Sequence, residues 1–120
     1  MRGSIALATG FLLALLLVVS AGSSEPSLEW SELYDGGGNH VDVGTAALCD
    51  PEGNIVVAGE SADGIAGTDM LIRKLERASS DTLWSKRFPA FDGNDMALTD
   101  MTWDRSGDLL VAGYIRGCEG

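Results

Sequence analysis

Two uninterrupted apolar runs stand out in the pattern of hydrophobic and polar positions along this chain. They cover residues 55–58 (Ile-Val-Val-Ala) and residues 109–112 (Leu-Leu-Val-Ala). Apolar side chains on both faces of an extended segment are typical of a strand that other layers cover on both sides. Each run therefore predicts a buried central strand.

Weaker strand signals surround both runs. Trp30 and Tyr34 are spaced to lie on one face of a strand, as are Trp84 and Phe88. The same spacing also fits a helix, but neither segment has a clear helix cap or continues for three turns. Further strands are predicted at residues 45–49, 69–75 and 96–103.

Two acidic turns connect the strands around the apolar runs. Residues 50–54 read Asp-Pro-Glu-Gly-Asn, and residues 104–108 read Asp-Arg-Ser-Gly-Asp. In each turn an aspartate comes first, and a glycine three positions later, Gly53 or Gly107, can adopt a positive φ before the chain returns as a strand. Pro51 suits a type I turn because its ring holds φ near −65°.

The chain repeats itself across these elements. Residues 30–60 align without a gap on residues 84–114, at a constant offset of 54, and eight of the 31 aligned pairs are identical. Ordinary composition would give about two identities by chance. The identical pairs are Trp30/Trp84, Ser31/Ser85, Thr45/Thr99, Asp50/Asp104, Gly53/Gly107, Val57/Val111, Ala58/Ala112 and Gly59/Gly113.

A period of this length indicates a supersecondary unit that stacks on copies of itself. Four short hairpin-linked strands per period, with an inner strand buried on both faces, describe a β-propeller blade. We therefore expect an all-β fold of antiparallel four-stranded β-propeller blades. The set is incomplete, with one full blade and most of a second, after an N-terminal signal peptide.

The motifs resemble the bacterial β-propeller repeat family often labelled SBBP. The resemblance rests on Trp30-Ser-x-x-Tyr34, on Asp50-x-x-Gly-Asn followed by the Val-rich run and Gly59, and on residues 67–75 (Gly-Thr-Asp-Met-Leu-Ile-Arg-Lys-Leu). It implies an exported or cell-surface protein with many blades and no established catalytic residues. The second copy stops at Gly120, after about 1.7 repeats in all, so the chain is expected to be a fragment of a longer protein.

The N-terminus has the pattern of a secretory signal peptide. Arg2 precedes an apolar run over residues 5–19, and small residues follow, with cleavage expected after Ala21. An uncleaved membrane anchor is the alternative, but fifteen residues fall short of the ~20 that span a bilayer. The expected division is a signal peptide at 1–21, a linker at 22–27, a first blade at 28–80 and a partial second blade at 81–120.

Charge restricts the partners of the chain. Its formal net charge is −10, and removal of residues 1–21 would delete Arg2 alone among the charged residues and leave −11. Such an acidic chain should repel nucleic acid and anionic membrane surfaces. It would tolerate divalent cations or basic partners, although scattered carboxylates can serve solubility alone.

The two cysteines, Cys49 and Cys118, do not form the framework of a small disulfide-rich protein. Export would permit a disulfide. The blade assignment, however, places Cys49 and Cys118 too far apart to form one. We therefore expect two free thiols.

Candidate catalytic motifs are weak. Residues 59–64 (Gly-Glu-Ser-Ala-Asp-Gly) approach a nucleophile elbow around Ser61, but the second glycine comes one residue too late and no helix pattern follows. A turn is the preferred interpretation. Residues 36–38 (Gly-Gly-Gly) lack the βαβ context of a dinucleotide site and indicate a flexible loop.

Binding motifs are equally weak. Residues 92–95 (Asp-Gly-Asn-Asp) offer oxygen ligands for calcium without the EF-hand spacing, and ordinary turn chemistry explains them as well. His40 is the only histidine and has no second histidine or cysteine for a metal. Trp30, Trp84 and Trp103 could line a carbohydrate-binding face, but the repeat favours inter-blade contacts for the first two.

The sequence therefore favours a non-catalytic exported segment that acts as a structural or interaction module. No catalytic, cofactor-binding or metal-binding residue is assigned. The expected partners are further propeller blades or other proteins, with weak calcium or carbohydrate binding left open. The alternative is part of a propeller-based enzyme or carbohydrate-binding protein whose site lies in blades not present here. The expected location is secreted, extracellular or at the cell surface, with the periplasm also open.

Overall fold

The computed structural model describes residues 14–20, 27–36, 41–62, 67–90 and 93–117. These residues form eight β-strands and no helix, which confirms the all-β prediction. The strands are β1 (Ala14–Ser20), β2 (Ser27–Tyr34), β3 (Asp42–Cys49), β4 (Ile55–Ser61), β5 (Asp69–Leu75), β6 (Thr82–Phe88), β7 (Asp95–Trp103) and β8 (Leu109–Arg116).

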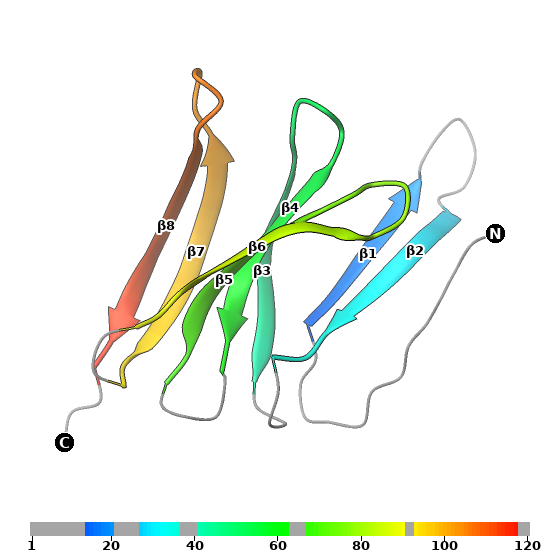
Figure 1. Cartoon of the computed structure of the whole chain (residues 1–120). Helices are drawn as coiled ribbons and strands as arrows, with labels where there is room; N and C mark the ends of the chain where they lie inside the picture. Colours follow the sequence, from blue (N-terminus) through cyan, green and yellow to red (C-terminus); the bar gives the residue numbers. More distant parts are fainter. Residues whose placement is uncertain (1–13, 21–26, 37–40, 63–66, 91–92, 118–120) are drawn as a thin grey trace.

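The eight strands form three antiparallel sheets. A four-stranded sheet in the order β3-β4-β5-β6 lies between a two-stranded sheet of β1 and β2 and another of β7 and β8. Figure 1 shows the three sheets as successive layers, with β7 and β8 at one side and β1 and β2 at the other. Among the described residues the sheets do not close into a ring.

The repeat recurs in the strand register. In the β3–β4 pair, Gly44 lies opposite Gly59 and the next pair is Ala46 with Ala58, so Thr45 is skipped in a bulge. The β7–β8 pair has the same register 54 residues later, and its bulge skips Thr99. The threonine that recurs in the sequence therefore marks a recurring irregularity of the sheet.

A second recurrence relates β1–β2 to β5–β6. Trp30 pairs with Val18 and the next pair skips Glu29, while Trp84 pairs with Lys74 and the next pair skips Leu83. The two skipped residues are 54 apart. Beside β2, strand β1 thus occupies the place that β5 occupies beside β6, although residues 14–20 belong to the predicted signal peptide.

The sheets begin at a different point of the period from the expected blades. The expected first blade covers residues 28–80 and so starts with the Trp30 segment, whereas the four-stranded sheet starts at Asp42 and ends with Phe88. The strand that contains Trp30, β2, pairs with β1 instead. A repeat defines the period of a structure but leaves open which strands share a sheet.

Two hydrophobic clusters hold the layers together. One contains Val56 and Ala58 of β4 with Leu98 and Met101 of β7. The other contains Val18, Trp30, Ile55 and Leu75, between the first sheet and the central one. Strand β4 therefore has buried side chains on both of its faces, as its apolar run predicts, and each fully buried aliphatic side chain contributes about 1.5–3 kcal/mol.

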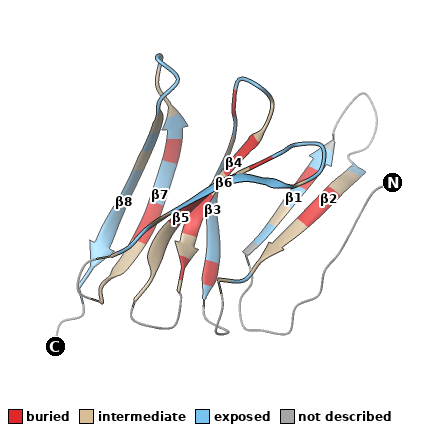
Figure 2. Ribbon diagram, in the orientation of Figure 1, coloured by how far each residue is buried: buried red, intermediate tan, exposed pale blue. Residues whose placement is uncertain are grey.

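The matching prediction for residues 109–112 is wrong. Strand β8 carries no buried position, and Leu110 is 52% exposed. Figure 2 shows buried positions on β2, β4 and β7 but none on β8. The physical reason is that β4 has a strand on each side and a layer on each face, while among the described residues β7 is the single strand beside β8.

The two acidic turns have the predicted conformation. The N–H groups of Glu52 and Asn54 donate to Asp50 Oδ1 at 3.0 and 2.8 Å. The same bonds recur at Asp104, which accepts from the N–H groups two and four residues later, both at 2.8 Å. Gly53 and Gly107 both adopt a φ of 85°, where a side chain would be strained.

Candidate functional site

A polar cluster around Arg87 lies where four strands end or begin near one another. Arg87 Nη1 contacts Asp69 Oδ2 at 3.0 Å, at the start of β5. Its Nη2 donates to Ser61 Oγ at 3.1 Å, at the end of β4, and to the hydroxyl of Tyr34 at 3.4 Å, at the end of β2. One guanidinium thus links the central sheet to the neighbouring β1–β2 sheet; we call these four residues the Arg87 cluster.

The charges in this cluster are mutually satisfied. Burial would lower the pKa of the Arg87 guanidinium, but its hydrogen bond to Asp69 and the contact with Tyr34 outweigh this and raise that pKa. A planar guanidinium with several donors suits such a fork of acceptors. The Arg87 guanidinium therefore stays protonated, and its donors are engaged by these three acceptors.

A second buried carboxylate lies next to this cluster. Asp42 is 3% exposed and pairs with Ser61 across β3 and β4. Its Oδ2 accepts the N–H of Gly36 at 2.8 Å, while among the described residues its Oδ1 has no hydrogen-bond partner. A Cβ at Gly36 would overlap Ser61 Oγ, so glycine is required for this close approach.

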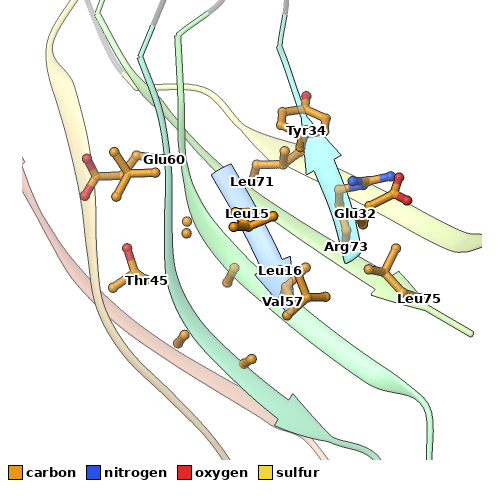
Figure 3. A pocket seen from close by; sticks show the side chains of 16 residues that line it. Leu15, Leu16, Glu32, Tyr34, Thr45, Val57, Glu60, Leu71, Arg73 and Leu75 are labelled. Carbon is orange, nitrogen blue, oxygen red and sulfur yellow. The ribbon is translucent and has the colours of Figure 1, made fainter. Parts of the chain in front are cut away.

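A cavity of about 260 Å³ lies between the β1–β2 sheet and the central sheet. Its lining is mainly aliphatic and includes Leu15 and Leu16 of β1 with Val57 and Leu71 of the central sheet, all labelled in Figure 3. Arg73 contributes the positive charge, with its guanidinium 4.9 Å from the ring centre of Tyr34. This cavity is at the small end for a ligand pocket.

Ser61 was expected in a turn but lies in a strand. It is the last residue of β4 and is 1% exposed. Its hydroxyl oxygen accepts a hydrogen bond from a guanidinium, which is a poor general base because it stays protonated. Residues 63 and 64, the end of that motif, lie outside the described residues.

The candidate calcium loop is only partly described. Asp92 and residues 37–40, which include His40, lie outside the described residues. Asp95 Oδ1 accepts the N–H of Thr68 at 3.1 Å and so connects the start of β7 to the residue before β5. The described part of the chain contains no group of three or more His, Cys, Asp or Glu side chains that could hold a metal ion.

The three tryptophans differ in environment. Trp30 is 7% exposed and its Nε1 donates to the carbonyl of Arg77 at 2.6 Å, an inter-sheet contact that the repeat predicts. Trp103 Nε1 donates to the carbonyl of Cys49 at 2.8 Å. Trp84, which is equivalent to Trp30, is 42% exposed, so its predicted inter-sheet burial is absent here.

Sequence reasoning did not identify Arg87, Asp42 or the ion pair between Lys74 and Asp50. Lys74 Nζ lies 2.5 Å from Asp50 Oδ2, and the Asp50 side chain is 3% exposed. The repeat offered no signal for Arg87, because the aligned residue is Leu33. Cys49 is a free, exposed cysteine, and Cys118 lies outside the described residues.

Comparison with known proteins gave no relatives for this chain. No family model, no curated protein and no solved structure matches it. Within the described residues, no helix is long and apolar enough to cross a membrane.

Proposed function

We propose that this chain is a non-catalytic segment of a β-propeller repeat protein and serves as a structural or interaction module. The observation that carries this proposal is the recurrence of strand register. The β3–β4 pair and the β7–β8 pair match residue for residue at an offset of 54, bulge included. Four-stranded antiparallel sheets that stack face to face in successive copies are the building units of propellers.

The chemistry of the described residues favours a structural role for the most polar site. Arg87 is engaged by Asp69, Ser61 and Tyr34, and these contacts tie two sheets together. A nucleophilic serine must be reachable by its substrate, whereas Ser61 is buried and its hydroxyl accepts a hydrogen bond from Arg87. We therefore assign the Arg87 cluster to inter-sheet cohesion.

Export remains a proposal that rests on the apolar run at residues 5–19 and on Ala21. It bears on the architecture, because the expected cleavage would remove β1. In the structure Val18 of β1 is 6% exposed and packs in the cluster with Trp30. Cleavage after Ala21 would remove residues 14–20, whereas the packing of β1 in this structure requires them.

Thermal-shift and hydrolysis assays on the full chain test the non-catalytic assignment. We expect no saturable shift in melting temperature with calcium or with a panel of oligosaccharides, and no ester hydrolysis above background. Ser61→Ala serves as the matched control for hydrolysis. A saturable shift, or hydrolysis that Ser61→Ala abolishes, would show that the chain carries a ligand site or an active site of its own.

A further inference from the structure

The two outer sheets are complementary halves of the central one. The β7–β8 pair repeats β3–β4, the first two strands of the four-stranded sheet. The β1–β2 pair repeats β5–β6, its last two strands, in orientation and in bulge position. The described residues therefore contain one half of a sheet on each side of the central sheet, and the two halves are complementary.

We propose that the chain assembles head to tail, with β8 of one copy pairing antiparallel with β1 of a second copy. The register follows from the central sheet, where Val56 pairs with Lys74 and Lys74 pairs with Trp84. Leu110 is equivalent to Val56, and Trp30 is equivalent to Trp84. Val18 pairs with Trp30 as Lys74 pairs with Trp84, so Val18 takes the place of Lys74. Leu110 of one copy therefore pairs with Val18 of the next.

Two exposed side chains of β8, Leu110 and Tyr114, lie on the face that this pairing would cover. Val56 and Ala58 pack toward the next layer of the chain, so their equivalents Leu110 and Ala112 point the same way, outward. Leu110 is 52% exposed, as is Tyr114 further along that face. In the joined sheet these side chains share a face with Val18, which packs on its own copy's central sheet.

The exposed side chains of β1 lie on the opposite face. Leu15, Leu17 and Val19 are 54, 52 and 48% exposed. In the joined sheet this face continues that of Leu109 and Val111, which pack against the cluster of the first copy. The central sheet of the second copy would thus cover the exposed face of β8, and the central sheet of the first copy would cover the exposed face of β1. The joined strands would then be covered on both faces, as β4 is within one copy. Exposed apolar rows of this kind mark association surfaces.

The proposed contact also changes the burial of Trp84. Its equivalent, Trp30, packs with Ile55 and Leu75. The counterpart of Ile55 is Leu109 of the same copy. The counterpart of Leu75 is Val19 of the second copy, because Leu75 pairs with Thr82, Val19 pairs with Leu28, and Thr82 and Leu28 are 54 residues apart. Docking of β1 would therefore bury Trp84, which is 42% exposed in the single chain.

The interface is heterologous, because one copy contributes β8 and the other contributes β1. Such contacts form a ring when the rotation closes and a filament when it does not. The described part of each chain supplies eight strands, enough for two four-stranded sheets, and closed propellers contain about four to eight sheets. We therefore expect rings of about two to four copies of the 12.6 kDa chain. Salt should favour assembly, because it screens the repulsion between copies that each carry a net charge of −10.

The proposal rests on the repeat architecture in Proposed function and requires that residues 14–20 stay on the chain. Full-length protein, produced without export, should be measured by multi-angle light scattering with intact mass. We expect a discrete mass of two to four copies with Met1 to Gly120 present. A monomer, or an assembled species that lacks residues 1–21, would overturn the proposal.

Leu110→Lys tests the interface itself. Leu110 is exposed in the single chain, so the substitution leaves the monomer fold intact and places a charge opposite Val18. We expect it to convert the assembly to monomer and to raise acrylamide quenching of Trp84 at least twofold. Ser106→Lys adds the same charge in the exposed turn before β8 and should leave the assembly unchanged. Equal effects of the two variants would contradict the proposed contact.

Disulfide trapping tests the register. In a Cys49→Ser, Cys118→Ser background, Val18→Cys and Leu110→Cys together should cross-link on oxidation, because paired Cα atoms in antiparallel strands lie about 4.5–5.5 Å apart. Each variant alone should give no cross-link. Cross-linking of Leu110→Cys alone would indicate a symmetric interface and overturn the head-to-tail proposal.

Hydrogen exchange separates the two proposals. Slow amide exchange in β3–β6 of a monomeric chain would leave the sheet architecture standing while the assembly fails. Fast exchange throughout that sheet would contradict the architecture.

Discussion

At the scale of single residues, equivalent positions of the repeat differ in their contacts, as Asp50 and Asp104 illustrate. Asp50 and Asp104 accept the same backbone N–H groups, but Asp50 also pairs with Lys74, which holds the pKa of its carboxyl below the ordinary value. The corresponding position beside the other turn would be Val18 of a second copy. One repeat therefore has an electrostatic contact that the other lacks.

This difference predicts a pH dependence. Because the folded pKa of Asp50 is depressed, its stabilisation is complete above the unfolded pKa, about 4, and is lost as pH falls through the folded pKa. We expect the melting temperature of the chain to fall more steeply below about pH 4 than that of Asp50→Asn. Asp104→Asn, which leaves the Lys74 pair intact, should keep the wild-type slope. Parallel curves for all three proteins would refute the role of the ion pair.

The two equivalent tryptophans should differ in their effect on stability. Trp30→Ala removes a buried side chain and its hydrogen bond to Arg77, and we expect a loss of about 3–5 kcal/mol in the free energy of unfolding. Trp84→Ala removes a half-exposed side chain and should cost about 1 kcal/mol or less. Urea unfolding in the Leu110→Lys background, which keeps the chain single, gives both values. Equal losses would mean that the two sites are packed alike.

At the scale of elements, the close approach of β3 and β4 depends on a recurring glycine. A Cβ on Gly59 would lie within van der Waals overlap of the Val43 carbonyl oxygen, and one on Gly113 would meet that of Ala97. Both glycines come just before the bulge at Thr45 or Thr99 on the facing strand. The recurrence of Gly in the sequence thus reflects backbone contact.

Substitution of this glycine should weaken the sheet. We expect Gly59→Ala to lower the free energy of unfolding by about 1–3 kcal/mol, because the strands must separate to admit the methyl group. Gly44→Ala is the matched control, since a Cβ there has no neighbour within 4 Å. Urea unfolding monitored by circular dichroism compares the two. A loss at Gly44 as large as that at Gly59 would show that the cost is not steric.

The sequence predicted the strands and turns well because their signals are local. The apolar run of β4, the Asp50 turn and the positive φ of Gly53 depend on neighbouring residues. The grouping of strands was not predictable in the same way, because the repeat is equally consistent with a sheet that starts at Trp30 or at Asp42. The Arg87 cluster was missed because its members come from strands far apart in the chain and are not repeated.

At the scale of the whole molecule, the fate of residues 1–21 decides which surfaces are open. Cleavage after Ala21 would remove Val18 and uncover Trp30 and the cavity that Leu15 and Leu16 line. The loss of the buried valine alone corresponds to about 1.5–3 kcal/mol.

We therefore expect a chain that begins at Gly22 to aggregate, or to melt without a sharp transition, and to show red-shifted tryptophan emission relative to the full chain. Light scattering, thermal circular dichroism and fluorescence measure these properties. Intact mass of exported protein identifies which form is produced. A monodisperse chain from Gly22 with a cooperative melt would show that β1 is dispensable.

The connectivity of the sheets also bears on how fast the protein folds. In the part of the chain that the structure describes, every hydrogen-bonded strand pair joins strands that are consecutive in the sequence, from β1–β2 to β7–β8. Chains with short sequence separation between contacts close smaller loops and fold faster than sandwiches or barrels with distant pairings. The central sheet can therefore grow one hairpin at a time from the Asp50 turn, without waiting for either end of the chain to be synthesised or docked.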